Sequence, residues 1–445
     1  MNSLGYEMEM IFNEDKDIEI ALQWLSKTLP EPNSLFDRMC LAQENYIKES
    51  ALKVNIGKES KIEWHGCDVV AGFFSQAKSY LDNRRSCDIS AASKILPWVK
   101  QLGVNVEYLN NIPGAVERAK RMLESYTVYP DNALFELILA GNYAAKGFDV
   151  EFIPEQKGIA KTPEFKCSFD GKALFVVECK RLKKGQYAQQ EESAHSIRAS
   201  FIESRVHLKR MSVWMDVTYK CEVNETPDDY LLKHLCNYYG KEYSWSDDYG
   251  SGFIKPANLR RVNDDIKLNG SLSLHTKLAR LIKTSPLDGE FYNVYAFGRP
   301  DERDPRFFSK INYATLLTWR NVSEVSLENR SRHITKHLKE IEDQISNNGL
   351  GVGHLVIDAD VQKDVADKRR EKNIEATLSF RIKSKLVRLN IHYLVPRVDE
   401  DNSWLVDETL EFFSGDELIS HLFPEVKLFS GVELFENDLP AWHQK

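Results

Sequence analysis

The sequence predicts a mixed α/β protein, in which an all-helical N-terminal domain precedes a mixed α+β sheet flanked by helices. Apolar residues recur at helical spacing through about the first 125 residues. After residue 129, short runs rich in β-branched and aromatic residues alternate with helical segments, which is typical of a sheet with helices packed on it. The chain has 445 residues, so we expect two or three domains.

Composition and charge exclude several classes of protein. No stretch approaches the roughly 18 apolar residues that span a bilayer, and the N-terminus lacks the basic and apolar segments of a secretory signal. The seven cysteines are scattered and include no C-x-x-C pair, which argues against a disulfide framework and a cysteine zinc site. We therefore expect a cytoplasmic protein with no membrane partner. The net charge of −8 counts against nucleic acid as a partner unless basic residues are segregated.

Residues 1–128 are expected to form the helical N-terminal domain, with a role in recognition, regulation or assembly. Pro and Gly lie mostly near the edges of its helical segments, as expected for helix ends. This domain is expected to bind a partner, either a second copy of the chain, which gives a homodimer, or another protein. The predicted helices cover 18–28, 35–51, 69–81 and 91–102, and a further short helix starts near Pro113 and Gly114.

A domain that contains strands is expected to begin at residue 129. Asp131 or Asn132 suits the N-cap of a helix over 133–146, and Gly147 suits its C-terminal end. Three β-rich runs follow this helix, and after them come a long polar helix and a further strand. These segments are 148–153, 164–169, 173–178, 186–209 and 211–221, and we assign 129–223 to the first part of the core domain.

Residues 224–285 are predicted to be an insertion, because they are rich in Asp, Tyr, Ser and Gly. We assign 286–398 to the second part of the core and the acidic tail, 399–445, to a C-terminal extension. The second part contains a helix with many charged residues at i,i+4 spacing. Its predicted strands are 291–297, 352–357 and 387–395, and its helix is 330–346.

Two charged residues, Glu178 and Lys180, end a strongly apolar predicted strand. They lie two residues apart and therefore project from the same face of that strand. The residues before them, 174–177, are Leu-Phe-Val-Val, which suits a strand buried on both faces. Because burial of a carboxylate or an amine is costly unless the group is paired or binds a cation, this pair is a candidate functional site.

The turn at Asp170 and Gly171 decides whether Glu164 joins this site. A two-residue turn places Glu164 on the face opposite to that of Glu178. A three-residue loop that begins at Phe169, with Gly171 in the left-handed conformation, places both carboxylates on one face. Gly171 suits that conformation, so we predict the three-residue loop.

These features together resemble the PD-(D/E)xK superfamily of restriction-endonuclease-like nucleases. In this family an acidic residue follows a proline on one strand, as Glu164 follows Pro163 here. A D/E-x-K triplet then ends the next strand, and Glu178, Cys179 and Lys180 match it. The resemblance implies a restriction-endonuclease-like core for the predicted sheet.

The resemblance extends over residues 131–185. Glu136 resembles the additional glutamate that the family often has on the preceding helix, and 330–358 resembles the later helix and strand of such a core. The acid-x-Lys triplet alone is unspecific, since it recurs elsewhere, for example at Glu59 and Lys61. The position at the end of an apolar strand distinguishes the triplet at the candidate site.

The resemblance implies a metal-dependent endonuclease. Glu164 and Glu178, together with the backbone carbonyl of Cys179, would hold Mg²⁺ or Mn²⁺, and Glu136 would contact the metal through water. Lys180 would orient the attacking water or stabilise the charge that develops on the phosphate. The expected substrate is DNA, and the expected context is restriction or anti-phage defence. The residues implied to hold backbone phosphates are Arg181, Lys183 and Lys184.

Glu164 departs from the family, which usually has Asp after the proline. The additional methylene lengthens the reach of the carboxylate, whereas Mg²⁺ demands octahedral geometry at about 2.0–2.1 Å. A second hypothesis therefore stays open, namely a catalytically inactive nuclease-fold protein that binds nucleic acid or serves as an assembly subunit. Other candidates are weaker: His333 and His337 lack the zincin glutamate and fit a solvated helix face, and His195 fits an ordinary surface position better than a DNA contact.

Overall fold

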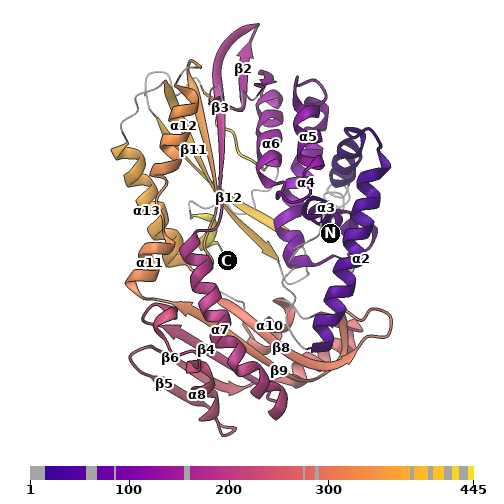
Figure 1. The fold of residues 1–445 in the computed structure, drawn as a ribbon, viewed down its shortest axis with the longest axis vertical. Coiled ribbons are helices and arrows are strands. Elements are labelled where there is room, and N and C mark those ends of the chain that lie inside the picture. Colours follow the sequence, from indigo (N-terminus) through magenta and orange to yellow (C-terminus); the bar gives the residue numbers. More distant parts are fainter. Residues whose placement is uncertain are drawn as a thin grey trace, which may run out of the picture.

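The protein, described here from a computed structural model, forms two mixed β-sheets with helices packed on them (Figure 1). The predicted mixed α/β class is therefore confirmed. Among the parts of the chain that are described, no helix combines the length and the apolar composition needed to cross a membrane. The described residues are 16–56, 68–84, 87–154, 161–273, 276–285, 290–346, 348–380, 385–398, 404–414, 423–429 and 439–444.

Helices form the N-terminal part of the chain. The predicted helices at 35–51, 69–81 and 91–102 lie within α2, α3 and α4. A further helix, α6, corresponds to the one predicted over 133–146. The bounds are α2 (Asn33–Ile56), α3 (Val69–Asp82), α4 (Ile89–Leu109), α5 (Ala115–Glu124) and α6 (Asp131–Ala145).

The first sheet has the strand order β1-β2-β3-β10-β11-β12. Its centre is parallel, because β10 pairs in parallel with both β3 and β11. Its edges are antiparallel, with β1, β2 and β3 forming a meander and β12 pairing with β11. The bounds are β1 (Asp149–Phe152), β2 (Phe165–Phe169), β3 (Lys172–Leu182), β10 (Gly351–Asp358), β11 (Leu386–Val398) and β12 (Trp404–Ser414).

The N-terminal helices share one hydrophobic core with the first sheet. Phe73 of α3, Leu134 of α6, and Val177 and Val356 of the sheet belong to a single buried cluster. The predicted domain 1–128 therefore has no separate core, because its helices bury their apolar faces against the sheet. The opposite face of the sheet is covered by α12 (Thr335–Ile345) and α13 (Lys363–Ser379).

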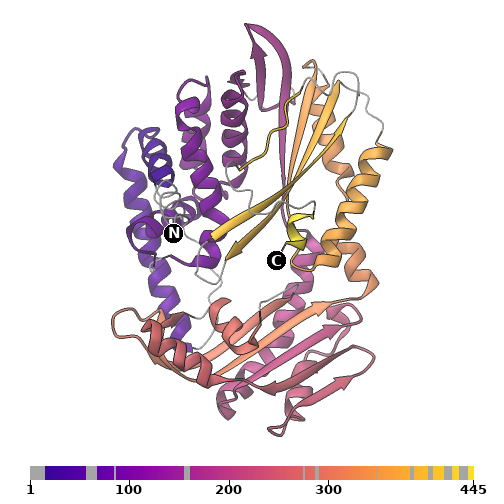
Figure 2. The same cartoon turned by 180° about the vertical axis from the view of Figure 1, so that it is seen from behind.

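The second sheet lies in the other half of the molecule (Figures 1 and 2). Its strand order is β5-β6-β4-β9-β7, and β8 pairs with β9. Its strands are β4 (Val213–Tyr219), β5 (Tyr243–Ser246), β6 (Gly250–Pro256), β7 (Leu272–Ser273), β8 (Phe291–Pro300) and β9 (Phe307–Asn321). The helices associated with it are α8 (Tyr230–Cys236), α9 (Leu259–Asn269) and α10 (Thr276–Lys283).

Several predicted domain boundaries are wrong. The strands predicted at 211–221 and 291–297 were assigned to the core that contains Glu178, but both lie in the second sheet. The inserted unit is therefore larger than 224–285. The prediction was too short because local composition indicates loops but does not indicate the long-range pairing of strands. The extension predicted from residue 399 contains β12, which is an edge strand of the first sheet.

A buried ion-pair network joins the two halves. Glu191 lies on α7 (Gln186–Lys209), which leads from β3 to β4, and Arg330 ends α11 (Glu324–Arg330). Arg330 pairs with Glu191 at 2.8 Å and with Asp360 at 2.7 Å. The side chains of Asn321 and Ser326 donate hydrogen bonds to the same glutamate at 2.8 and 2.7 Å. The network therefore fixes the second sheet to the segments that flank β3 and β10.

We predict that Arg330→Met lowers the free energy of unfolding by about 3–5 kcal/mol, because the substitution leaves the buried carboxylate of Glu191 without its cation. Urea unfolding measures the change. The matched control is Lys233→Met, which removes an exposed ion pair to Asp229 and should cost less than about 1 kcal/mol. A loss in Arg330→Met no larger than that of the control would contradict the assigned role.

Candidate active site

The hairpin that carries the candidate site turns through two residues, Asp170 and Gly171. Phe169 pairs with Lys172 across the turn, and the two central residues have φ of 50° and 71°. Positive φ at both positions is the requirement of a type I′ turn, which Asp-Gly favours and whose twist matches that of the flanking strands. The predicted three-residue loop is therefore wrong.

A β-bulge supplies the shift in register that the longer loop was expected to provide. The pairing of β2 with β3 shifts by one position, which leaves Leu174 as an extra residue on β3. Phe165 consequently pairs with Val177, and the backbone N–H of Glu164 donates to the Val177 carbonyl at 3.0 Å. Glu164 therefore lies at the end of the hairpin, beside Glu178.

Strand β3 continues beyond the end of β2. Its residues 178–182 pair with residues 353–357 of β10 on one side, whereas the ladder with β2 has ended at Phe165. Among the described strands, none pairs with the other side of this segment. The strand edge that carries the candidate site is therefore accessible to side chains from neighbouring helices.

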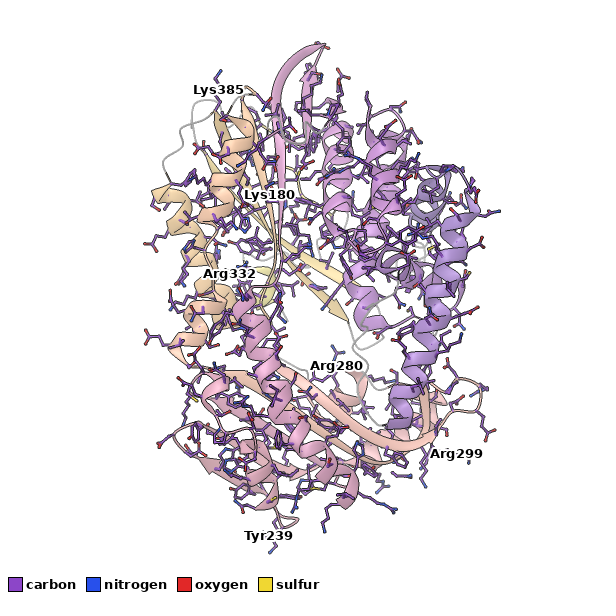
Figure 3. All side chains as sticks on the ribbon, viewed as in Figure 1. Lys180, Tyr239, Arg280, Arg299, Arg332 and Lys385 are labelled. Carbon is purple, nitrogen blue, oxygen red and sulfur yellow. The ribbon has the colours of Figure 1, made fainter. Side chains whose placement is uncertain are left out.

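The carboxylate of Glu178 is fully buried, with no exposed side-chain surface. Its Oε1 lies 2.5 Å from Nζ of Lys180, and its Oε2 has no hydrogen-bond partner among the described residues. Burial raises the pKa of Glu178 to about 8, against the effect of Lys180, and the charge of Glu164 raises it further. Figure 3 shows Lys180 on β3, where a quarter of its side chain, 24%, is exposed. The pair thus connects a buried carboxylate to the surface.

Arg118 of α5 is a further member of the site. Its guanidinium contacts the carboxylates of Glu136 and Glu164, the second at 3.2 Å. It also lowers the pKa of Glu178, which places its charge within reach of that group. Sequence reasoning missed Arg118, because it belongs to none of the motifs and lies 46 positions before Glu164.

Two of the residues predicted to hold phosphates are engaged in ion pairs. Arg181 is largely buried and pairs with Asp131 at 2.8 Å. Lys184 is exposed but pairs with Glu192 of α7. Lys183 is exposed at the surface beyond the end of β3. Of the three predicted residues, Lys183 is the one best placed for a phosphate.

Other residues that the sequence singled out are buried in the protein or paired with neighbouring side chains. Cys179 lies between Glu178 and Lys180 on β3, and its side chain is buried in the core shared with the N-terminal helices. His195 is buried and not at the surface as predicted, because its ring hydrogen-bonds Tyr219 at 3.1 Å and stacks on an aromatic side chain of the second sheet. His337 pairs with Glu340 on α12.

A buried hydrogen-bond chain crosses the core next to the site. The Nδ2 group of Asn390 is a donor, so Nε2 of His354, at 3.2 Å, is the acceptor. The hydroxyl of Tyr143 donates to the same Nε2 at 2.9 Å. The proton of His354 is then on Nδ1, which donates to Nε2 of His392 (2.9 Å). The Nδ1 proton of His392 in turn reaches the carboxylate of Glu408 (2.6 Å). Burial lowers the pKa of His354, consistent with a neutral ring.

This chain fixes α6 against the sheet. Tyr143 on α6 is joined to side chains of β10, β11 and β12 through it. Glu136 lies two helical turns earlier on the same helix and therefore on a similar side. The position of Glu136 relative to β3 thus depends on contacts that no sequence motif marks.

The donor type at the site is the one that a hard divalent cation prefers. The candidate ligands are carboxylate oxygens, and the buried Oε2 of Glu178 lacks a hydrogen-bond partner among the described residues. Within the same residues, no group of three or more His, Cys, Asp or Glu side chains is placed to hold a metal ion. Arg118 lies between Glu136 and Glu164. No protein-family model, curated protein or solved structure matches the chain.

We predict that Glu178→Gln stabilises the protein above neutral pH. The pKa of Glu178 in the folded state lies above its ordinary value of 4.5. The contribution of Glu178 to the stability of the wild type is therefore fully present below pH 4.5 and is lost as the pH rises to about 8. The neutral amide avoids this loss, and we expect a gain of roughly 2–4 kcal/mol at pH 8.5 that vanishes near pH 4.5. Urea unfolding from pH 4.5 to 9 tests it. Parallel pH profiles of the two proteins would show that Glu178 is not a buried charge.

Proposed function

We propose that the chain is a metal-dependent nuclease that hydrolyses phosphodiester bonds in nucleic acid, with Glu164, Glu178 and Lys180 at its reaction centre. The observation that carries the proposal is the fully buried carboxylate of Glu178, which lies beside Glu164 at an open strand edge. Burial of this charge destabilises the fold. Groups that cost stability in this way are concentrated at functional sites.

The order of the elements around the site supports a restriction-endonuclease-like core. Helix α6 precedes the antiparallel strands β1, β2 and β3, and β10 then pairs in parallel with β3. Helix α12 precedes β10 and packs next to β3, which agrees with the resemblance of 330–358 to the later part of such a core. The second sheet then represents an insertion between β3 and β10.

Each residue of the site has a defined role in this proposal. Glu164, Glu178 and the backbone carbonyl of Cys179 would hold Mg²⁺ or Mn²⁺, and Glu136 would contact it through water. When bound, the metal lowers the pKa of a water molecule and neutralises charge on the phosphate. Lys180 bridges the buried carboxylate and the surface, so its ammonium can orient Glu178 and stabilise the negative charge of a phosphate held there.

DNA is the substrate that we propose, in the context of restriction or anti-phage defence. The context rests on the resemblance in sequence and not on a residue of the site. Lys183 is exposed just beyond the site and would hold a backbone phosphate. Double-strand cleavage needs two sites, so we propose a homodimer as the active form.

One observation favours the second candidate, a catalytically inactive nuclease-fold protein that binds nucleic acid or assembles with a partner. The guanidinium of Arg118 already compensates Glu136 and Glu164. A site whose carboxylates are neutralised by an arginine is stable without a metal and needs no catalytic role. Nucleic-acid binding without cleavage would identify this candidate.

We predict cleavage of plasmid, linear or single-stranded DNA in the presence of Mg²⁺ or Mn²⁺, with RNA as a comparison substrate. Lys180→Ala should slow it roughly 10²–10⁴-fold, because the substitution removes the cation that acts on the transition state. The control is Lys166→Ala on the same hairpin, where Lys166 forms an exposed ion pair with Glu151. Absence of metal-dependent cleavage on every substrate, or an undiminished rate in Lys180→Ala, would exclude the catalytic proposal.

A further inference from the structure

Arg118 places a positive charge among the three glutamates of the site. It contacts Glu136 and Glu164, and it acts electrostatically on Glu178. Only 14% of its side chain is exposed, so water screens these interactions weakly. Three carboxylates in such surroundings repel one another unless a cation compensates them. Arg118 therefore stabilises the site in the absence of a metal.

A guanidinium and a divalent metal compete for the same carboxylate oxygens. Nη2 of Arg118 contacts both carboxylates, and the planar guanidinium holds its donors in a fixed fork. Mg²⁺ instead needs oxygen ligands in direct contact at about 2.0–2.1 Å. With Arg118 in place, the described residues offer no group of three ligands for a metal. Arg118 must therefore leave before a metal can bind Glu164 directly and reach Glu136 through water.

The start of α5 is fixed to the edge of the first sheet. The backbone N–H of Phe152 donates to the carbonyl of Pro113 at 3.0 Å. Gly114 has φ +87°, and a Cβ at this position would come within 2.7 Å of Cβ of Phe152. Arg118 lies one turn further along α5, which packs beside α6 near the hairpin (Figure 1). Because these contacts hold the helix start, rotation of the Arg118 side chain disturbs the fold less than a movement of α5 as a way to release the carboxylates.

We propose that Arg118 is a built-in counter-ion that competes with the divalent cation for Glu136 and Glu164 and must rotate away before the metal binds. This inference rests on the proposed function, because it concerns the same metal site. Arg118 thereby sets the metal concentration at which the site fills. It also keeps the site folded when the metal is absent.

The test is Mn²⁺ binding by the full chain, measured by isothermal titration calorimetry and by the Mn²⁺-dependent rise in melting temperature. Arg118→Met should bind Mn²⁺ at least about tenfold more tightly than the wild type and should be less stable without the metal. Arg118→Lys keeps the charge but loses the fork, so it should have intermediate affinity. The control is Lys120→Met on the same helix, which removes only an exposed pair with Glu124 and should match the wild type.

The outcomes separate this proposal from the proposed function. Equal Mn²⁺ affinity in the wild type, Arg118→Met and Arg118→Lys would overturn the role of Arg118, even if the wild type cleaves DNA. Absence of Mn²⁺ binding in all variants would overturn the metal site itself. Tighter binding in Arg118→Met that is lost again in Arg118→Met/Glu164→Gln would establish that the arginine and the metal share Glu164. If Arg118→Met fails to fold, Arg118→Lys carries the same comparison.

Discussion

The exclusion of water from Glu178 is the constraint from which the arrangement of the candidate site follows. A fully buried carboxylate must be protonated or compensated by positive charge. Burial raises the pKa of Glu178, and the charges of Lys180 and Arg118 oppose that rise. Lys180 supplies charge from the same strand, and Arg118 supplies it from α5 while holding Glu136 and Glu164. The five side chains therefore form one electrostatic unit, in which Lys180, Glu164 and Arg118 act on the buried carboxylate of Glu178.

Three structural features keep this unit in place. The extra residue Leu174 in β3 sets the register that brings Glu164 beside Glu178. The buried hydrogen-bond chain that begins at Tyr143 fixes α6 to the sheet, and with it the helix that carries Glu136. The ion pairs of Arg330 fix the second sheet beside the segment that follows β3. The hydrogen-bond chain and the ion pairs of Arg330 link segments that lie far apart in the sequence.

The local structure around the site could be predicted from the sequence, because it depends on neighbouring residues. Helix α6, the hairpin strands and the position of the turn follow from apolar spacing and turn preferences, whereas the predicted three-residue form of the turn is wrong. The need for one extra residue in the hairpin was also predictable, but its position was not, since a β-bulge leaves no local sequence signal. Arg118 and the second sheet could not be predicted, because the contact with Glu164 and the pairing of β4 with β9 join distant segments.

We propose that the three glutamates around Arg118 form a site for a divalent cation. A crystal structure of the full chain grown with Mn²⁺, with anomalous diffraction data, tests it most directly. We expect an anomalous peak in contact with the carboxylates of Glu164 and Glu178, together with an Arg118 side chain rotated away from Glu164. An Arg118 that still bridges Glu136 and Glu164, with no anomalous peak at the site at saturating Mn²⁺, would contradict it.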